Sequence, residues 1–259
     1  MPLGTERSAV QNPLIRYAEE AGWTYFPSDE AMRLRGGEGG LLLHEIFLSQ
    51  AQRLNPGIVD HARAEDLAKR LTRVLPRIEG NLEAWEYLRG LKTVFVPEEK
   101  RERNVRLLAE NWEHNTYHVT DELRFYNSTH RIRIDVAFFV NGIPVQLIET
   151  KAATELEGLS IALEQVRRYH REGPELLALI QVYTLTHLVQ YYYGPTWNTS
   201  RKSLFNWRSD FSPLQVSGER DDKEHRLGVR EVSFIPSKQR RTNHSCSTRT
   251  REKKTSRAS

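Results

Sequence analysis

Three charged residues interrupt an otherwise apolar stretch of the chain. Asp135, Glu149 and Lys151 are the charged side chains within residues 134–151. A lone charge inside an apolar strand is costly to bury unless it has a partner. Along an extended strand, Glu149 and Lys151 point to one face and Thr150 points to the other. The pattern therefore predicts an acid and an amine side by side, with Asp135 returned to their neighbourhood by the preceding strand.

These groups predict a site for a divalent cation. Two carboxylates and a backbone carbonyl make an oxygen cage that suits Mg²⁺, which keeps several of its waters. Lys151 would then position or deprotonate a metal-bound water, the nucleophile for phosphodiester cleavage. The alternative is a structural ion pair, in which Lys151 neutralises Glu149 at the end of a strand.

The two strands that must position these groups are separated by an Asn-Gly pair at 141–142, a strong hairpin signal. A regular two-residue loop would place Asp135 opposite Ile148, and the two carboxylates would then lie on opposite faces of the sheet. A shared site needs a shift of one residue. A three-residue loop with a bulge, or an equivalent bulge in the strand, sets Asp135 opposite Glu149, with Lys151 on the same face.

Residues 134–151, IDVAFFVNGIPVQLIETK, resemble the Asp…Glu-x-Lys core of the PD-(D/E)xK nucleases. In particular, they resemble the N-terminal nuclease domain of type I restriction enzyme R subunits, whose hairpin has a similar Phe-Val-Asn-Gly-Ile-Pro turn. Gln165 and Tyr169 reproduce the Gln-x-x-x-Tyr element that those subunits carry on the following helix, and residues four apart share a helix face. The resemblance extends over about residues 1–210.

The resemblance implies a role for each of these side chains. Asp135 and Glu149 are expected to bind Mg²⁺, and the backbone carbonyl of Thr150 is expected to be a further ligand, although the family often has an apolar residue at this position. Lys151 is expected to activate water. The Gln-x-x-x-Tyr pair is expected to orient Lys151 or a DNA phosphate.

The resemblance also implies ATP-dependent cleavage of double-stranded DNA, in a complex with specificity and methyltransferase subunits of a restriction-modification system. The sequence contains no G-x-x-x-x-G-K-[ST] motif, so we expect a nuclease domain truncated before its helicase motor. The alternative function is a non-catalytic relic or interaction module that docks to the methyltransferase and specificity subunits or to DNA. The intact Asp, Glu and Lys favour the nuclease.

Apolar periodicity predicts helices followed by a sheet. The expected fold is α/β and restriction-endonuclease-like, with a mixed central sheet flanked by helices and an N-terminal helical layer, in one domain over 1–212. Helices are predicted over 10–21, 41–54, 61–75, 82–88 and 157–170. Strands are predicted over 93–96, 105–108, 117–119, 131–140, 145–150, 179–184 and 188–193.

The net charge of +4 is not evidence of a basic DNA-binding body. Residues 237–259 hold eight of the 38 basic side chains and one acidic one, so the rest of the chain is slightly acidic. We expect a basic, disordered tail over 213–259. The single cysteine excludes an internal disulfide framework, and no membrane span or secretory signal is evident, so a cytoplasmic location is expected.

Overall fold

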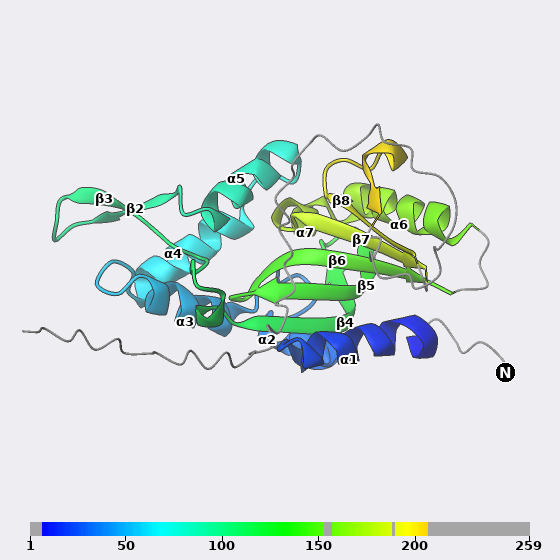
Figure 1. Ribbon diagram of the computed structural model, residues 1–259. Helices are drawn as coiled ribbons and strands as arrows, with labels where there is room; N and C mark the ends of the chain where they lie inside the picture. The colour runs from blue at the N-terminus through cyan, green and yellow to red at the C-terminus, as the bar shows by residue number, and fades with distance from the viewer. Residues whose placement is uncertain (1–6, 153–156, 188–189, 207–259) are drawn as a thin grey trace, which may run out of the picture.

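The computed structural model describes residues 7–152, 157–187 and 190–206, and it shows helices packed on a central sheet (Figure 1). The tail predicted over 213–259 lies outside the described residues. The helices are η1 (Arg7–Gln11), α1 (Asn12–Glu20), α2 (Ser28–Leu34), α3 (His44–Leu54), α4 (His61–Thr72), α5 (Ile78–Leu88), η2 (Trp112–His114), α6 (Gly158–Glu172), α7 (Pro174–Leu179) and η3 (Arg201–Ser203). The strands are β1 (Thr24–Phe26), β2 (Thr93–Val96), β3 (Arg101–Asn104), β4 (Tyr117–Tyr126), β5 (Arg131–Val140), β6 (Ile143–Lys151), β7 (Val182–His187), β8 (Gln190–Pro195) and β9 (Phe205–Asn206).

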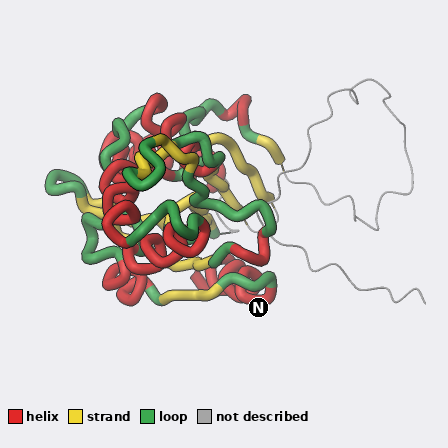
Figure 2. The backbone as a smooth tube through the Cα atoms, turned by 90° about the vertical axis from the view of Figure 1, so that its left-hand side faces the viewer, coloured by secondary structure: helices red, strands yellow, loops and turns green. Residues whose placement is uncertain are grey.

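Seven strands form one mixed sheet in the order β1-β4-β5-β6-β7-β8-β9. β1 runs parallel to β4 and β6 runs parallel to β7, while the other neighbours are antiparallel. α1 covers one face of the sheet, and α6 and α7 cover the other (Figure 1). Figure 2, viewed from the side of α3–α5, shows helices on more than one side of the strands. The predicted α/β class with a mixed sheet flanked by helices is confirmed.

The predicted single N-terminal helical layer is wrong in two respects. Residues Thr24–Phe26 form β1, which joins the sheet beside β4. The N-terminal helices also divide between two hydrophobic cores, because α1 packs on one face while α3–α5 share a core with α7 and the opposite face. An apolar period shows that a helix has a buried side, but it does not show which surface that side meets.

One predicted strand is wrong and another begins later than predicted. Residues 105–108 are not a strand, and β3 lies just before them over four charged or polar residues that carry no apolar alternation. The strand expected from residue 179 begins only at Val182, because the preceding residues form α7. Residues 176–180 are all fully buried, and a short continuous apolar run suits a buried helix as well as a strand. The strands predicted over 93–96 and 131–140 have the predicted bounds, and the other predicted helices and strands are present with shifted ends. β4 runs on to Tyr126, and residues 188–189 of the last predicted strand lie outside the described residues.

The β5–β6 hairpin combines a two-residue loop with a bulge. The loop residues 141–142 have φ values of 51° and 82°, and the strands pair directly beside them. The pairing shifts by one residue further along the hairpin, so that Val136 pairs with Ile148. The next pair in that register is Asp135 with Glu149. The three-residue loop is therefore wrong, whereas the equivalent bulge is confirmed.

Contacts from outside the hairpin hold this tight loop. The Asn141 side chain donates to the Leu107 carbonyl at 2.8 Å. A Cβ atom on Gly142 would lie 2.7 Å from the Leu43 oxygen and the Phe47 nitrogen, at the start of α3. Because the loop fits so closely against α3, the extra residue is accommodated within the strand and not in the turn.

Candidate active site

Thr150 at the end of β6 bonds to Asp135 on β5, and the neighbours of Thr150, Glu149 and Lys151, lie beside this pair. Glu149 and Thr150 are fully buried, and Asp135 and Lys151 are 4% and 8% exposed. β6 is an inner strand between β5 and β7, where polar side chains must find partners within the protein. The structure brings together the four residues that the sequence analysis placed at one site.

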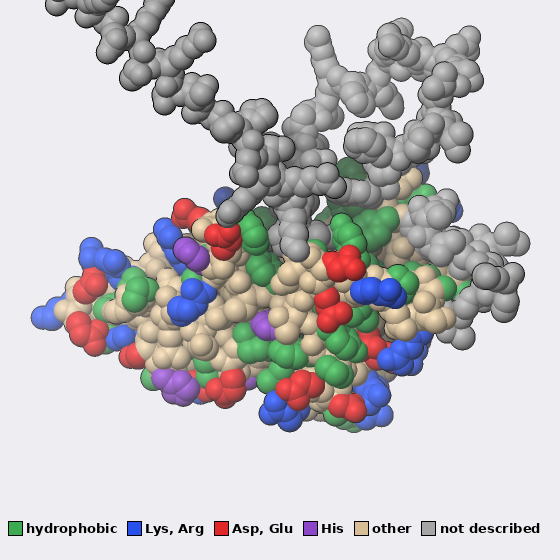
Figure 3. All heavy atoms as spheres, turned by 60° about the horizontal axis from the view of Figure 1, so that its bottom comes forward, with side chains coloured by type: hydrophobic (Ala, Val, Ile, Leu, Met, Phe, Trp, Pro, Cys, Tyr) green, Lys and Arg blue, Asp and Glu red, His purple; other side chains and the backbone are tan. Residues whose placement is uncertain are grey.

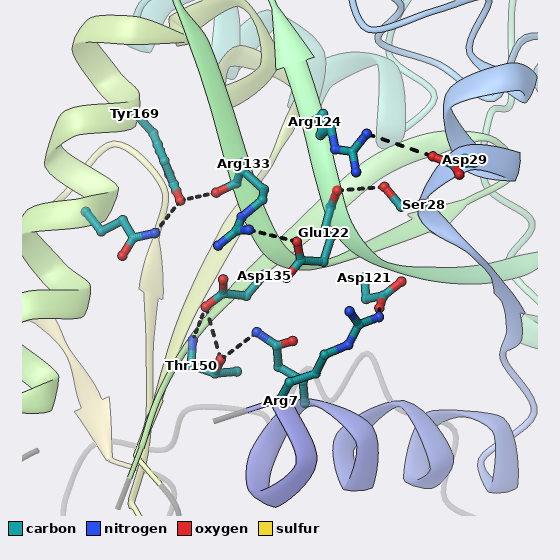
Figure 4. A network of polar contacts seen from close by, with 12 residues as sticks. Arg7, Ser28, Asp29, Asp121, Glu122, Arg124, Arg133, Asp135, Thr150 and Tyr169 are labelled. Atoms are coloured by element: carbon teal, nitrogen blue, oxygen red, sulfur yellow. Dashed lines mark hydrogen bonds and ion pairs between the residues drawn. The ribbon is translucent and has the colours of Figure 1, made fainter. Parts of the chain in front are cut away.

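Thr150 binds one oxygen of Asp135 (Figure 4). The Thr150 N–H donates to Oδ2 at 2.8 Å, and the Thr150 hydroxyl donates to the same oxygen at 3.0 Å. These two bonds fix the carboxylate of Asp135 against β6. They also leave Oδ1 as the oxygen that Asp135 presents to any further ligand.

η1 contributes a residue that the sequence analysis missed. The Nε2 of Gln11 donates to Thr150 Oγ1 at 3.2 Å. Because that hydroxyl gives its hydrogen to Asp135, it can only accept from Gln11, which fixes the orientation of the amide. The Oε1 of Gln11 is buried and has no hydrogen-bond partner within the described part of the chain. No local pattern marks Gln11, since it lies 139 residues from Thr150 in sequence.

Glu149 is held at one oxygen and lacks a partner at the other. Its Oε1 contacts the Tyr169 hydroxyl at 3.0 Å, whereas Oε2 is buried and has no hydrogen-bond partner among the described residues. Burial, and then the charge of Asp135, raise the pKa of Glu149 well above its usual value, while Lys151 acts to lower it. Without a cation, the site therefore favours a protonated Glu149.

The Gln-x-x-x-Tyr pair on α6 reaches Glu149 through Tyr169. Gln165 Nε2 donates to the Tyr169 hydroxyl at 2.7 Å, and that hydroxyl donates to the Arg133 carbonyl. A phenol has one hydrogen, so a protonated Glu149 would donate to Tyr169, which gives each of the three contacts of the hydroxyl one donor and one acceptor. Burial, and then Glu149, raise the pKa of the fully buried Tyr169. These contacts are to Glu149 and not to Lys151, which the sequence analysis expected the pair to orient.

A divalent cation between Asp135 and Glu149 would supply the missing partner of Glu149 Oε2. In the described residues, no three His, Cys, Asp or Glu side chains gather as a metal cluster, so backbone carbonyl and water would provide the remaining ligands. Such a set suits Mg²⁺, which takes oxygen ligands and keeps several waters, and it does not suit Zn²⁺, which favours His and Cys.

The surface carries charges of both signs. Figure 3 shows Lys, Arg, Asp and Glu side chains interspersed on one face, with no block of a single sign. This mixture agrees with the near-balanced charge of the chain outside residues 237–259. Across residues 7–152, 157–187 and 190–206, no helix is long and apolar enough to cross a membrane.

Comparison with known proteins gives a family for this fold and site. Residues 4–202 match the family described as type I restriction enzyme R protein N terminus. Two similar proteins of Methanocaldococcus jannaschii are named as the MjaVIIP and MjaVIIIP endonuclease subunits of type I restriction enzymes. The first is 30% identical over 112 residues, which are 43% of this chain and 10% of that protein. The second is 33% identical over 106 residues, which are 39% of this chain and 10% of that protein.

The match to the family covers most of the chain, while the aligned region spans about a tenth of each of these relatives. The residues of the hairpin, the bulge and α6 all lie within the matched range. The chain belongs to the family of type I restriction enzyme R proteins, through the N-terminal region of those proteins.

Proposed function

We propose that this domain is a PD-(D/E)xK nuclease domain that cleaves double-stranded DNA with the help of Mg²⁺. The observation that supports it most is the bulge in the β5–β6 hairpin, since that shift brings Asp135 and Glu149 into one register. A structural ion pair between Glu149 and Lys151 would need only one carboxylate. It would not account for Asp135, a second buried carboxylate whose charge raises the pKa of Glu149. Membership of the R protein family supports the same conclusion.

In this proposal, Asp135, Glu149 and the backbone of Thr150 are the groups that would hold the cation. When bound, Mg²⁺ supplies Lewis acidity to a phosphoryl oxygen and lowers the pKa of a coordinated water. Thr150 has two roles in this proposal: its carbonyl oxygen would bind the cation, and its N–H and hydroxyl orient Asp135. Tyr169 orients Glu149.

Lys151 lies beside this pair and acts on a water. Its ammonium group interacts favourably with the Glu149 carboxylate. In the proposed reaction, Lys151 Nζ holds the attacking water in line with the phosphorus and takes part in moving its proton. Gln165 supports the site indirectly, by fixing the hydroxyl of Tyr169.

Family membership suggests the partners. We propose duplex DNA as the substrate and the specificity and methyltransferase subunits of a restriction-modification complex as the protein partners. ATP is not part of the chemistry that we propose for this chain, whose sequence has no P-loop motif.

Nicking of supercoiled plasmid by the purified chain tests the proposal. We expect weak, non-specific nicking that requires Mg²⁺ or Mn²⁺ and is lost in Asp135→Asn and in Lys151→Met. Asp121→Asn is the matched control, because Asp121 is a buried carboxylate bound by Tyr25 and Arg7 instead. Nicking that survives in both site variants would contradict the proposal. Absence of nicking, together with tight binding of the partner subunits, would favour an interaction module.

A further inference from the structure

One part of the sheet is open beside the candidate site. Beyond Asp135, toward the β4–β5 turn, the side chains alternate between the core and solvent. The inward residues are fully buried: Leu123, Phe125, Ile132 and Ile134. The outward residues, which we call the arginine strip, are all exposed: Arg124, Tyr126, Arg131 and Arg133.

The arginine strip begins beside Asp135, at the point where β5 exchanges its faces. Ile134 belongs to the core on the α6 side and Val136 to the core under α1, so Asp135 stands between the two faces. Arg133 lies on the α1 side, because its neighbour Ile134 faces the other core. The Asp135 carboxylate reaches that side too, where it accepts from the Thr150 hydroxyl that meets Gln11. Along β5, the buried residues that pack under α1 begin only at Val136 and continue in the direction away from the strip. The helix therefore covers the sheet up to Asp135 and leaves the strip uncovered.

The charges of the strip are not explained by stability alone. Arg124 pairs directly with Arg133 across β4 and β5, and like charges at opposed positions are destabilising. The acid nearest to Arg124 is Asp29, at 3.9 Å and 83% exposed, and such a pair contributes little. The two arginines therefore hold opposed guanidinium groups on an open surface, each beside one acidic side chain, Asp29 for Arg124 and Glu122 for Arg133.

A strained residue holds Arg133 in place. The Glu122 carboxylate accepts from Arg133 Nη1 at 2.9 Å (Figure 4). Glu122 has a φ of 49°, a left-handed conformation that is unfavourable for a residue with a side chain. Glu122 lies where the buried side chains of β4 change from one face of the sheet to the other. Val119 packs in the core under α1, whereas Leu123 packs in the core on the opposite face. The strain thus coincides with the switch that exposes the strip.

The remaining arginine is held in a similar way. Arg131 donates to Glu38 at 2.8 Å, and its guanidinium lies over the ring of Tyr126 at 5.3 Å from the ring centroid. Its side chain is 62% exposed. The contacts orient the guanidinium while leaving it accessible to a ligand in solvent.

We propose that the arginine strip binds the phosphodiester backbone of duplex DNA and leads it to Asp135. Guanidinium groups match the geometry of phosphate oxygens, and a backbone of closely spaced phosphates would relieve the repulsion between Arg124 and Arg133. This inference rests on the proposed function, because the strip derives its meaning from a phosphodiester-cleaving site at its end.

Fluorescence anisotropy of a labelled DNA duplex tests the inference. The full chain is titrated in Ca²⁺ without Mg²⁺, over about 50 to 200 mM salt. Each phosphate contact contributes about 0.9 to the slope of log affinity against log salt. We expect Arg124→Gln and Arg133→Gln each to lower the slope by about 0.9 and the double variant to lower it by about twice that amount. Arg133→Lys, which keeps the charge, retains most of the slope.

Arg77→Gln is the control, because Arg77 is 62% exposed and paired with Glu79 away from the sheet. Its slope should equal that of the original chain. An unchanged slope in a folded Arg124→Gln/Arg133→Gln variant would overturn the inference, as would a loss of binding to a methyltransferase subunit without any loss of DNA binding. Asp135→Asn separates the two proposals, because it should abolish nicking while leaving the salt slope unchanged.

Discussion

Removing the hydroxyl of Tyr169 tests the anchor of Glu149. The hydroxyl accepts from Gln165, donates to the Arg133 carbonyl and contacts Glu149 at 3.0 Å. Tyr169→Phe keeps the ring in the core and leaves these three groups without that partner. Tyr183→Phe is a matched control, because Tyr183 is also fully buried but donates a single bond, to the Asn198 carbonyl at 3.1 Å.

The number and burial of the partners set the expected magnitude. A single neutral hydrogen bond contributes about 1 kcal/mol, whereas a buried polar group left unsatisfied costs about 1–3 kcal/mol. We therefore expect Tyr183→Phe to lower the free energy of unfolding by about 1 kcal/mol. Tyr169→Phe should lower it by about 3 kcal/mol, because a part-buried carbonyl and a buried carboxyl both lose their partner.

Urea denaturation at neutral pH, followed by tryptophan fluorescence, measures both changes. With a slope of about 2 kcal/mol per M, Tyr169→Phe should move the midpoint by about 1.5 M without changing the slope. Tyr169→Phe should also weaken the stabilisation by Mg²⁺, because Glu149 loses its positioning contact. A midpoint shift no larger than that of Tyr183→Phe would refute the reasoning that Tyr169 anchors a buried carboxyl.

Three further predictions concern the elements around the site. Burial lowers the pKa of His118 to about 4, so on acidification the unfolded chain binds a proton at this histidine before the folded chain does. The free energy of unfolding should therefore fall by up to roughly 3 kcal/mol between about pH 6.5 and pH 4. His118→Gln should flatten this part of the pH profile, and an unaltered profile would exclude the histidine as its cause. Gly142→Ala should lower the free energy of unfolding, measured by urea denaturation, by at least about 2 kcal/mol, because φ is positive and the added Cβ would lie 2.7 Å from the backbone of α3. Gly36→Ala should lower it by less, because φ is positive there too but the surrounding space is open. Equal losses would show that the contact with α3 is unimportant. Gln11→Leu should lower the melting temperature and reduce the gain on adding Mg²⁺, since Thr150 loses a buried donor; a full gain would mean that η1 does not position the site.

The hairpin shows how far the sequence can predict this site. The requirement that Asp135 and Glu149 share one face was sufficient to predict a shift of one residue, because side chains alternate along a strand. The sequence could not place the shift, since that depends on how closely α3 packs against Gly142. The chemistry of the residues predicted the register, and the tertiary contacts determined how it is achieved.

Other features depend on contacts between distant parts of the chain. Gln11 binds Thr150 from the far end of the sequence, and no spacing rule connects them. The Gln-x-x-x-Tyr pair shared a helix face as predicted, yet its target proved to be Glu149 because Tyr169 is fully buried under β6. α7 was missed because residues 176–179, four of its six, are fully buried and apolar and leave no polar face to reveal its period.

Thermal unfolding with and without Mg²⁺ tests most directly whether Asp135 and Glu149 hold one cation. A ligand bound only by the folded state at ten times its Kd adds about 1.4 kcal/mol, which corresponds to a rise in Tm of about 3–6 °C for a domain of this size. We predict that rise for the original chain and for Asp121→Asn, and its loss in Asp135→Asn. An equal rise in Asp135→Asn, or an equal loss in Asp121→Asn, would contradict a cation site between these two strands.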